Sequence, residues 1–167
     1  MGRFRRSRVA RTRRGTYELH LAGPERELLA DLVDQLRELL SLTTDDPTVR
    51  RLFPTAYHDD PERDREYQQL VRDELLERRL AALTTVEETT TLAELTEEQL
   101  SGWLTALNDL RLVLGTRLDV SEDAGGELDE DDPNAPALAV YGYLGSLLAE
   151  VVDALTDGLP PPTEPEM

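Results

Sequence analysis

The chain has 167 residues, a hydrophobic content of 39%, no cysteine and a formal net charge of −17. A chain of this length typically forms one domain with its own hydrophobic core. Without cysteine, these residues cannot form disulfides, thiolate nucleophiles or cysteine-zinc sites. We find no apolar run of bilayer length and no signal-peptide pattern, so the sequence predicts a cytoplasmic protein that does not enter a membrane.

A β-hairpin is the first predicted element, over residues 4–21. Apolar and polar residues alternate from Tyr17 to Leu21, which is typical of a strand with one buried face. Gly15 follows two arginines and can supply the positive φ of the turn. The hairpin would therefore carry most of the arginines found at the start of the chain.

Four helices follow, each predicted from apolar residues at helical spacing. They cover about residues 24–41, 61–83, 97–118 and 137–156. Asp60 precedes a proline and can cap the second helix, and Thr96 with Gln99 forms a capping box for the third. The sequence therefore predicts a mainly α fold, a four-helix bundle-like domain with an N-terminal β-hairpin, as a single helical domain over residues 1–156.

Three segments outside these helices have loop-like compositions. Residues 86–95 are rich in threonine and acids, which indicates a loop with some extended character. Residues 119–136 hold eight acids and are expected to form an acidic mobile loop. This loop partly matches a calcium-binding loop, but Ala124 stands where that motif requires glycine, which argues against a calcium site. Residues 157–167 are expected to be a disordered tail.

Positive charge is concentrated in residues 1–14, which contain seven arginines and no acid, so that the segment carries +7 and the rest of the chain −24. The seven arginines are Arg3, Arg5, Arg6, Arg8, Arg11, Arg13 and Arg14. One interpretation is an arm that contacts phosphate groups, those of DNA included, because guanidinium groups match phosphate oxygens. The other is that the arginines dock on the chain's own acidic surface.

The segment "LFPTAYHDDP", residues 52–61, joins two predicted helices. Its aromatic residues Phe53 and Tyr57 could anchor a partner, or they could fold back over a helix end and fix the direction of the next helix.

No constellation of reactive residues is evident. The histidines are His20 and His58, and neither has a metal-ligand spacing or a nearby serine nucleophile. Ser146 lacks the strand-turn-helix setting of a hydrolase nucleophile, and no glycine-rich phosphate loop is present. We therefore expect no enzyme, no catalytic residue, no cofactor and no metal site.

Three stretches carry a family resemblance: "RRLFPTAYHDD", "WLTALNDLRLVLGTRLDV" and "YGYLGSLLAEVVDAL". With them the chain resembles an actinobacterial domain-of-unknown-function family that includes the oxidative-stress regulator AosR. The resemblance implies a transcription-linked regulator with DNA or the transcription machinery as partner. Asn108, Asp109 and Arg111 match its most specific motif, and they could equally form a polar structural clasp. The redox-sensing version of this role depends on cysteines, which are absent here.

Two functions are therefore predicted. The first is a non-enzymatic regulatory protein that binds DNA or a transcription-machinery protein through the arginine segment, without a cysteine redox switch. The alternative is a homodimeric protein–protein interaction module without nucleic-acid contact, docking through a helix face or through Phe53 and Tyr57. A small-molecule sensor with a pocket between helices is a third option.

Overall fold

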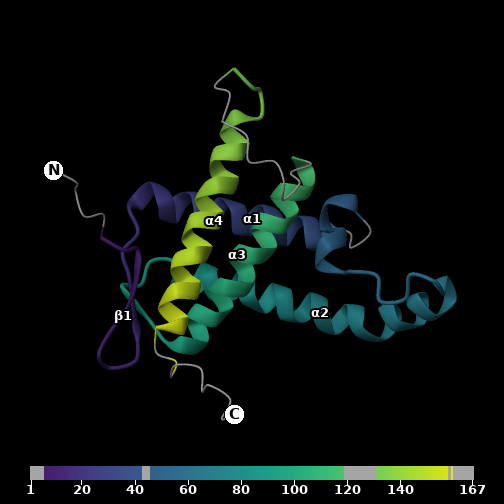
Figure 1. The fold of residues 1–167 in the computed structure, drawn as a ribbon, viewed down its shortest axis with the longest axis horizontal. Helices are drawn as coiled ribbons and strands as arrows, with labels where there is room; N and C mark the ends of the chain where they lie inside the picture. The colour runs from purple at the N-terminus through teal and green to yellow at the C-terminus, as the bar shows by residue number, and fades with distance from the viewer. Residues whose placement is uncertain (1–5, 43–45, 119–130, 158, 160–167) are drawn as a thin grey trace, which may run out of the picture.

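The computed structural model describes residues 6–42, 46–118, 131–157 and 159 of the chain (Figure 1). Its elements in chain order are β1 (Val9–Arg11), β2 (Tyr17–Leu19), α1 (Gly23–Leu42), the 3-10 helix η1 (Pro47–Leu52), α2 (Pro61–Thr89), β3 (Glu94–Leu95), α3 (Glu97–Arg117) and α4 (Ala135–Thr156). The predicted mainly α fold with an N-terminal hairpin is confirmed. In Figure 1, α1 and α2 run across the view, α3 runs obliquely between them, and α4 passes in front of α1.

A small antiparallel sheet holds the hairpin to the helices. Val9 of β1 lies opposite Leu19 of β2, and Tyr17 of β2 lies opposite Leu95 of β3. These four side chains are buried, and the turn uses Gly15 at a φ of 83°. The third strand was not predicted, because two residues give no alternation pattern, and it ties the hairpin to the junction between α2 and α3.

Helix α2 ends at Thr89, six residues beyond the predicted end at 83. Threonine has a low helix propensity, which favoured a loop in the sequence. In the structure, the hydroxyls of Thr84, Thr85 and Thr89 donate to the carbonyls four residues earlier, and Val86 is buried in the core. Tertiary burial therefore overrides the local propensity.

Helix α3 is the central element and packs against α4, α2, η1 and α1. The predicted capping box between Thr96 and Gln99 is present at its start. Trp103 is fully buried, as expected for a residue near the core centre, and its indole N–H donates to the Thr89 hydroxyl at 2.7 Å. At Gly102 a Cβ would lie 2.9 Å from Thr85 Cγ2, so glycine allows the close approach of α2 and α3.

Helix α4 begins at Ala135, slightly before the predicted start, and packs on α3 and β1. By length and composition alone α4 could span a membrane, because its most apolar 18-residue stretch has a mean hydropathy of 1.4. Its inner face is buried through Leu144, Leu147 and Val151. Gly145 accommodates Arg111, whose Nε would lie 3.4 Å from a Cβ, whereas nothing lies within 4 Å of that position at Gly142.

Candidate interaction surfaces

The base of the hairpin is held by an arginine that the sequence grouped with the candidate contact residues. Arg8 has a side chain that is 14% exposed, and its Nε and NH2 contact Oε2 of Glu150 in α4 at 2.5 Å. NH2 also donates to the Ser146 hydroxyl at 2.8 Å, and NH1 donates to Glu25 of α1 at 3.4 Å. The guanidinium carbon lies 5.1 Å from the ring centre of Tyr143. Arg8 therefore joins β1, α1 and α4.

The directions of the pKa shifts around Arg8 agree with a tightly paired guanidinium group. Burial alone would lower the pKa of Arg8, but the hydrogen bond and charge of Glu150 outweigh burial and raise it. The pKa of Glu25 is lowered, because the Ala22 N–H and Arg8 stabilise its carboxylate more than burial disfavours it. Burial, together with the Glu25 charge, raises the pKa of Tyr143 to about 12. At neutral pH, Arg8 and Glu25 are therefore charged and Tyr143 keeps its proton, and these contacts serve the fold.

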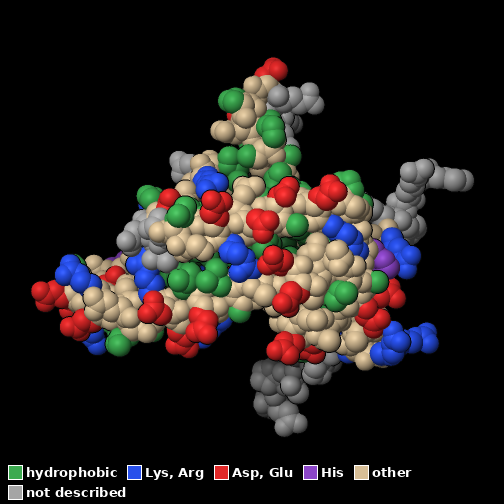
Figure 2. Space-filling view, turned by 180° about the vertical axis from the view of Figure 1, so that it is seen from behind, with side chains coloured by type: hydrophobic (Ala, Val, Ile, Leu, Met, Phe, Trp, Pro, Cys, Tyr) green, Lys and Arg blue, Asp and Glu red, His purple; other side chains and the backbone are tan. Residues whose placement is uncertain are grey.

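The other described arginines of the segment remain at the surface. Arg6, Arg11, Arg13 and Arg14 are exposed. Arg14 contacts both carboxylate oxygens of Glu94, at 3.0 and 3.1 Å, and Arg6 lies 3.9 Å from Glu18. In Figure 2, basic side chains project at the lower right, where the hairpin tip lies. Arg3 and Arg5 lie outside the described residues.

The aromatic segment before α2 folds back along that helix. Phe53 is buried beneath the guanidinium of Arg72, whose carbon lies 5.2 Å from the ring centre. Tyr57 meets Tyr67 edge to face at 5.9 Å, and Asp64 accepts the backbone N–H of Tyr57 at 3.2 Å. Of the two interpretations, these contacts correspond to packing against α2.

The motif residues Asn108, Asp109 and Arg111 lie in three different environments on α3. Asn108 is exposed. Asp109 is 1% exposed and its Oδ1 accepts from Arg79 of α2, which also donates to the Leu52 carbonyl at 3.2 Å. The Arg111 guanidinium lies over the Tyr141 ring of α4, 4.9 Å from its centre.

Two atoms of this motif are buried without a hydrogen-bond partner in the described fold, Oδ2 of Asp109 and Nε of Arg111. Burial raises the pKa of Asp109, and the charge and hydrogen bond of Arg79 offset only part of this rise. The Asp109–Arg79 pair ties α3 to α2, as a structural clasp would. Buried polar atoms normally find partners, so the two remaining atoms are candidates for a further contact.

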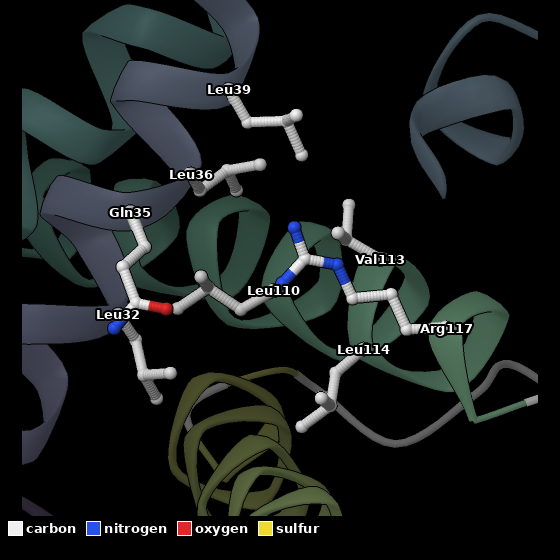
Figure 3. A pocket seen from close by; sticks show the side chains of 8 residues that line it. All are labelled: Leu32, Gln35, Leu36, Leu39, Leu110, Val113, Leu114 and Arg117. Carbon is white, nitrogen blue, oxygen red and sulfur yellow. The ribbon is translucent and has the colours of Figure 1, made fainter. Parts of the chain in front are cut away.

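A small hollow lies between α1 and α3, with a volume of about 60 Å³. Figure 3 shows Leu36 and Leu39 pointing into it from α1, and the Arg117 side chain lying back along α3 toward Leu110. An arginine stem covers apolar surface in this way while its charged end stays accessible. The hollow is small, and the Arg117 side chain is part of its lining.

Sequence reasoning missed the partners that define these sites, Glu25 and Glu150 for Arg8, and Arg79 for Asp109. With 35 acidic residues in the chain, no spacing singles out a particular carboxylate. Within the described parts of the chain, no group of three or more His, Asp or Glu residues is placed to hold a metal ion. The acidic stretch compared with a calcium loop, residues 119–130, lies outside them.

These features define a class of helical domain with an arginine-bearing N-terminal hairpin and with the sequence LNDLRL, residues 107–112, in its central helix α3. The model of the family named Domain of unknown function (DUF2017) matches residues 1–155, and the chain belongs to this family. The oxidative stress regulator AosR of Mycobacterium tuberculosis strain H37Rv is 31% identical over 134 residues, covering 66% of this chain and 62% of the relative.

The corresponding AosR of Mycobacterium bovis gives the same identity and coverage. A relative from Mycobacterium leprae is 30% identical over 128 residues, covering 66% of this chain and 59% of its own length. The chain thus spans about three fifths of the length of these relatives. No solved structure matches the chain.

Proposed function

We propose that this protein is a non-enzymatic, transcription-linked regulatory protein of the cytoplasm that contacts DNA or a transcription-machinery protein through its hairpin arginines. The names of the relatives, which are oxidative stress regulators, support a regulatory role. A cysteine redox switch is not part of the proposal, because these 167 residues contain no cysteine.

One observation carries the proposal: the hairpin exposes arginines on an otherwise acidic molecule. Arg11, Arg13 and Arg14 lie at or beside the turn and are exposed, and Arg14 shares its charge only with the exposed Glu94 among the described residues. Guanidinium groups on a projecting turn can reach phosphate oxygens while the acidic body stays at a distance. Arg8, which the sequence grouped with them, is held inside the fold and is left out of the proposed contact.

Binding of a fluorescent DNA duplex at low and moderate salt tests the direct-DNA version. Changing Arg11, Arg13 and Arg14 to serine is expected to remove most of the binding and to lower the salt slope by about 0.9 for each phosphate that is no longer neutralised. A matched control changes Arg50, Arg51 and Arg65 to serine, which are exposed elsewhere. No binding by the unaltered chain at any salt concentration would exclude direct DNA contact.

A binding experiment with purified proteins tests the version in which the partner is a transcription-machinery protein. The unaltered chain and the triple-serine hairpin variant are used as bait against purified RNA polymerase with and without sigma factors. Retention by the unaltered chain and loss in the variant, with no DNA binding, would assign the arginines to an acidic protein surface. Equal retention of both baits would exclude the hairpin as the contact.

A second candidate function is a homodimeric interaction module without nucleic-acid contact. The observation that favours it is the apolar character of α4, of whose most apolar stretch only 22% is buried. Light scattering over a range of concentrations tests it, because a chain that stays monomeric cannot act as a homodimer.

A further inference from the structure

The outward side of α4 carries mostly small or apolar side chains, with Asp153 as its exposed charged residue over positions 139–153. Its exposed positions over this stretch are Ala139, Gly142, Ser146, Ala149, Val152 and Asp153. Val152 is 40% exposed, and the Ser146 hydroxyl accepts from Arg8. An apolar face of a helix is normally covered by another element. Glycine within a helix costs about 1 kcal/mol, and Gly142 has no neighbour in the described fold that requires it.

Beside this face lies a groove between α3 and α4, which we call the α3–α4 groove. It consists of two adjoining hollows of about 480 and 470 Å³ that share Leu148 and Val152. The second hollow is also lined by Asp109, which is 1% exposed and has a buried Oδ2 without a hydrogen-bond partner in the described fold. The groove therefore combines an apolar floor with an acceptor that has no donor among the described residues.

The first hollow holds two opposite charges that do not pair with each other. Arg111 and Asp153 both line it, and neither side chain forms an ion pair with any residue that the structure describes. Asp153 also lines a neighbouring hollow with Arg11 of β1. A surface with a cation and an anion around an apolar centre, each without an ion-pair partner within the described fold, is complementary to itself, as a two-fold symmetric interface requires.

The positions of these charges fit an antiparallel pairing of two α4 helices. Arg111 lies beside Gly145, with its Nε 3.4 Å from where a Cβ would be. If two copies of α4 cross antiparallel at Ala149, position 145 of one copy faces position 153 of the other. Arg111 of each copy would then meet Asp153 of its counterpart, and the small side chain of Ala149 would let the helices approach closely at the crossing point.

We infer that the chain forms a two-fold symmetric dimer in which the outward faces of two α4 helices cross near Ala149 and Arg111 pairs with Asp153 across the interface. This inference rests on the second candidate function and names its surface. Because β1 packs against α4, the dimer carries two arginine hairpins, and the DNA-binding measurement above remains a separate test.

The mass in solution is the first measurement. Light scattering coupled to size exclusion should give twice the chain mass of 18.8 kDa at micromolar concentration. The variant Ala149→Arg places a large cation at the crossing point, on an exposed position, and should give a monomer with unchanged melting temperature. An unaltered chain that stays monomeric up to about 100 µM would overturn the inference.

A charge exchange then tests the proposed contact itself. Arg111→Glu and Asp153→Arg each create two like-charge pairs in the symmetric dimer, and each should weaken self-association at least tenfold. An equimolar mixture of the two variants restores both attractive pairs and should give a mixed dimer, detected by a tag on one variant. A mixture that stays monomeric while both variants remain folded would contradict the assigned contact.

Two control variants test whether the loss of self-association depends on where the charge is changed. Asp34→Arg and Arg51→Glu make the same charge changes at exposed positions outside the groove and should dimerise normally. Because Arg111 contacts Tyr141, circular dichroism accompanies each measurement, and the exposed Asp153→Arg variant supports the conclusion if Arg111→Glu fails to fold. Co-sedimentation of the monomer with phosphatidylcholine–phosphatidylglycerol vesicles, lost in Ala149→Arg, would assign the α4 face to lipid and overturn the inference.

Discussion

Burial gives the arginines of this protein two different roles. We compare the arginines that lie between packed elements, called seam arginines, with those at the hairpin turn, called tip arginines. The seam arginines, Arg8 and Arg79, reach carboxylates on other helices, whereas the tip arginines are Arg11, Arg13 and Arg14. The Arg8 side chain is 14% exposed and that of Arg14 is 76% exposed. An ion pair withdrawn from water is costly to break, and an exposed pair contributes little. The comparison therefore assigns stability to the seam and leaves the tip available for binding.

The largest effect is expected at the seam between α2 and α3. Arg79→Ala would leave Asp109 buried without its cation, and the free energy of unfolding should fall by about 3 kcal/mol. Urea denaturation measures this change. Replacing both partners, as Arg79→Met with Asp109→Leu, should recover much of the loss, because no charge then remains buried. A loss below about 1 kcal/mol for the single variant would show that water reaches Asp109.

A smaller effect is expected at the hairpin base. Arg8→Ser would leave Glu25 and Glu150 facing each other without their shared cation, and both are about one quarter exposed. We expect a loss of about 2 kcal/mol in the same denaturation experiment, less than at Arg79 because solvent screens the remaining carboxylates. If Arg8→Ser leaves stability unchanged and abolishes DNA binding instead, the separation between seam and tip is wrong at this residue.

Substitution of the tip arginines should leave stability almost unchanged and should weaken binding. Changing Arg11, Arg13 and Arg14 to serine should alter the free energy of unfolding by less than about 0.5 kcal/mol, as is usual for exposed side chains. The same variant should lose most of its binding to the acidic ligand, DNA or protein. Thermal melting and the binding measurement, made on one preparation, decide between the roles.

The smallest effect is a pH dependence that differs in sign between two seam carboxyls. The pKa of Glu25 is lowered from its ordinary value of 4.5, so its contribution to stability is present at neutral pH and is lost as the pH falls below about 4.5. The pKa of Asp109 is raised from 3.8, so stability falls as the pH rises above about 3.8 through the raised value.

Two variants separate these contributions. Glu25→Gln should be less stable than the unaltered chain at pH 7, and this difference should shrink toward pH 3.5 by less than about 1 kcal/mol. Asp109→Asn should gain stability relative to the unaltered chain as the pH rises over the same range. Urea denaturation at several pH values measures both trends, and trends of the same sign would contradict the assignment of one of the two groups.

Most of the fold could be predicted from local pattern. The leucine stripes located the four principal helices, and the capping box at Thr96 fixed the start of α3. The pattern failed where tertiary contacts decide the outcome. The last turns of α2 are helical although they are rich in threonine, and β3 is a strand of two residues that exists only because β2 pairs with it.

The candidate sites were less predictable than the fold. The sequence located the arginine segment and the Asn108 to Arg111 motif, but it could not divide them into structural and accessible residues. That division depends on partners far away in the chain, such as Glu150 for Arg8. The outward face of α4 could not be predicted, because exposure follows from how the helices pack.

The pairing of Arg8 with Glu150 has a consequence for synthesis. The two residues are separated by 142 positions, and β3, which completes the sheet, follows β2 only after the whole of α1 and α2. A chain emerges from the ribosome amino terminus first. The hairpin arginines therefore leave the exit tunnel long before Glu150, whose carboxylate holds Arg8 at the base of the hairpin. Until α4 is translated, Arg8 has no Glu150 with which to pair, and the base of the hairpin is not yet fixed to α4.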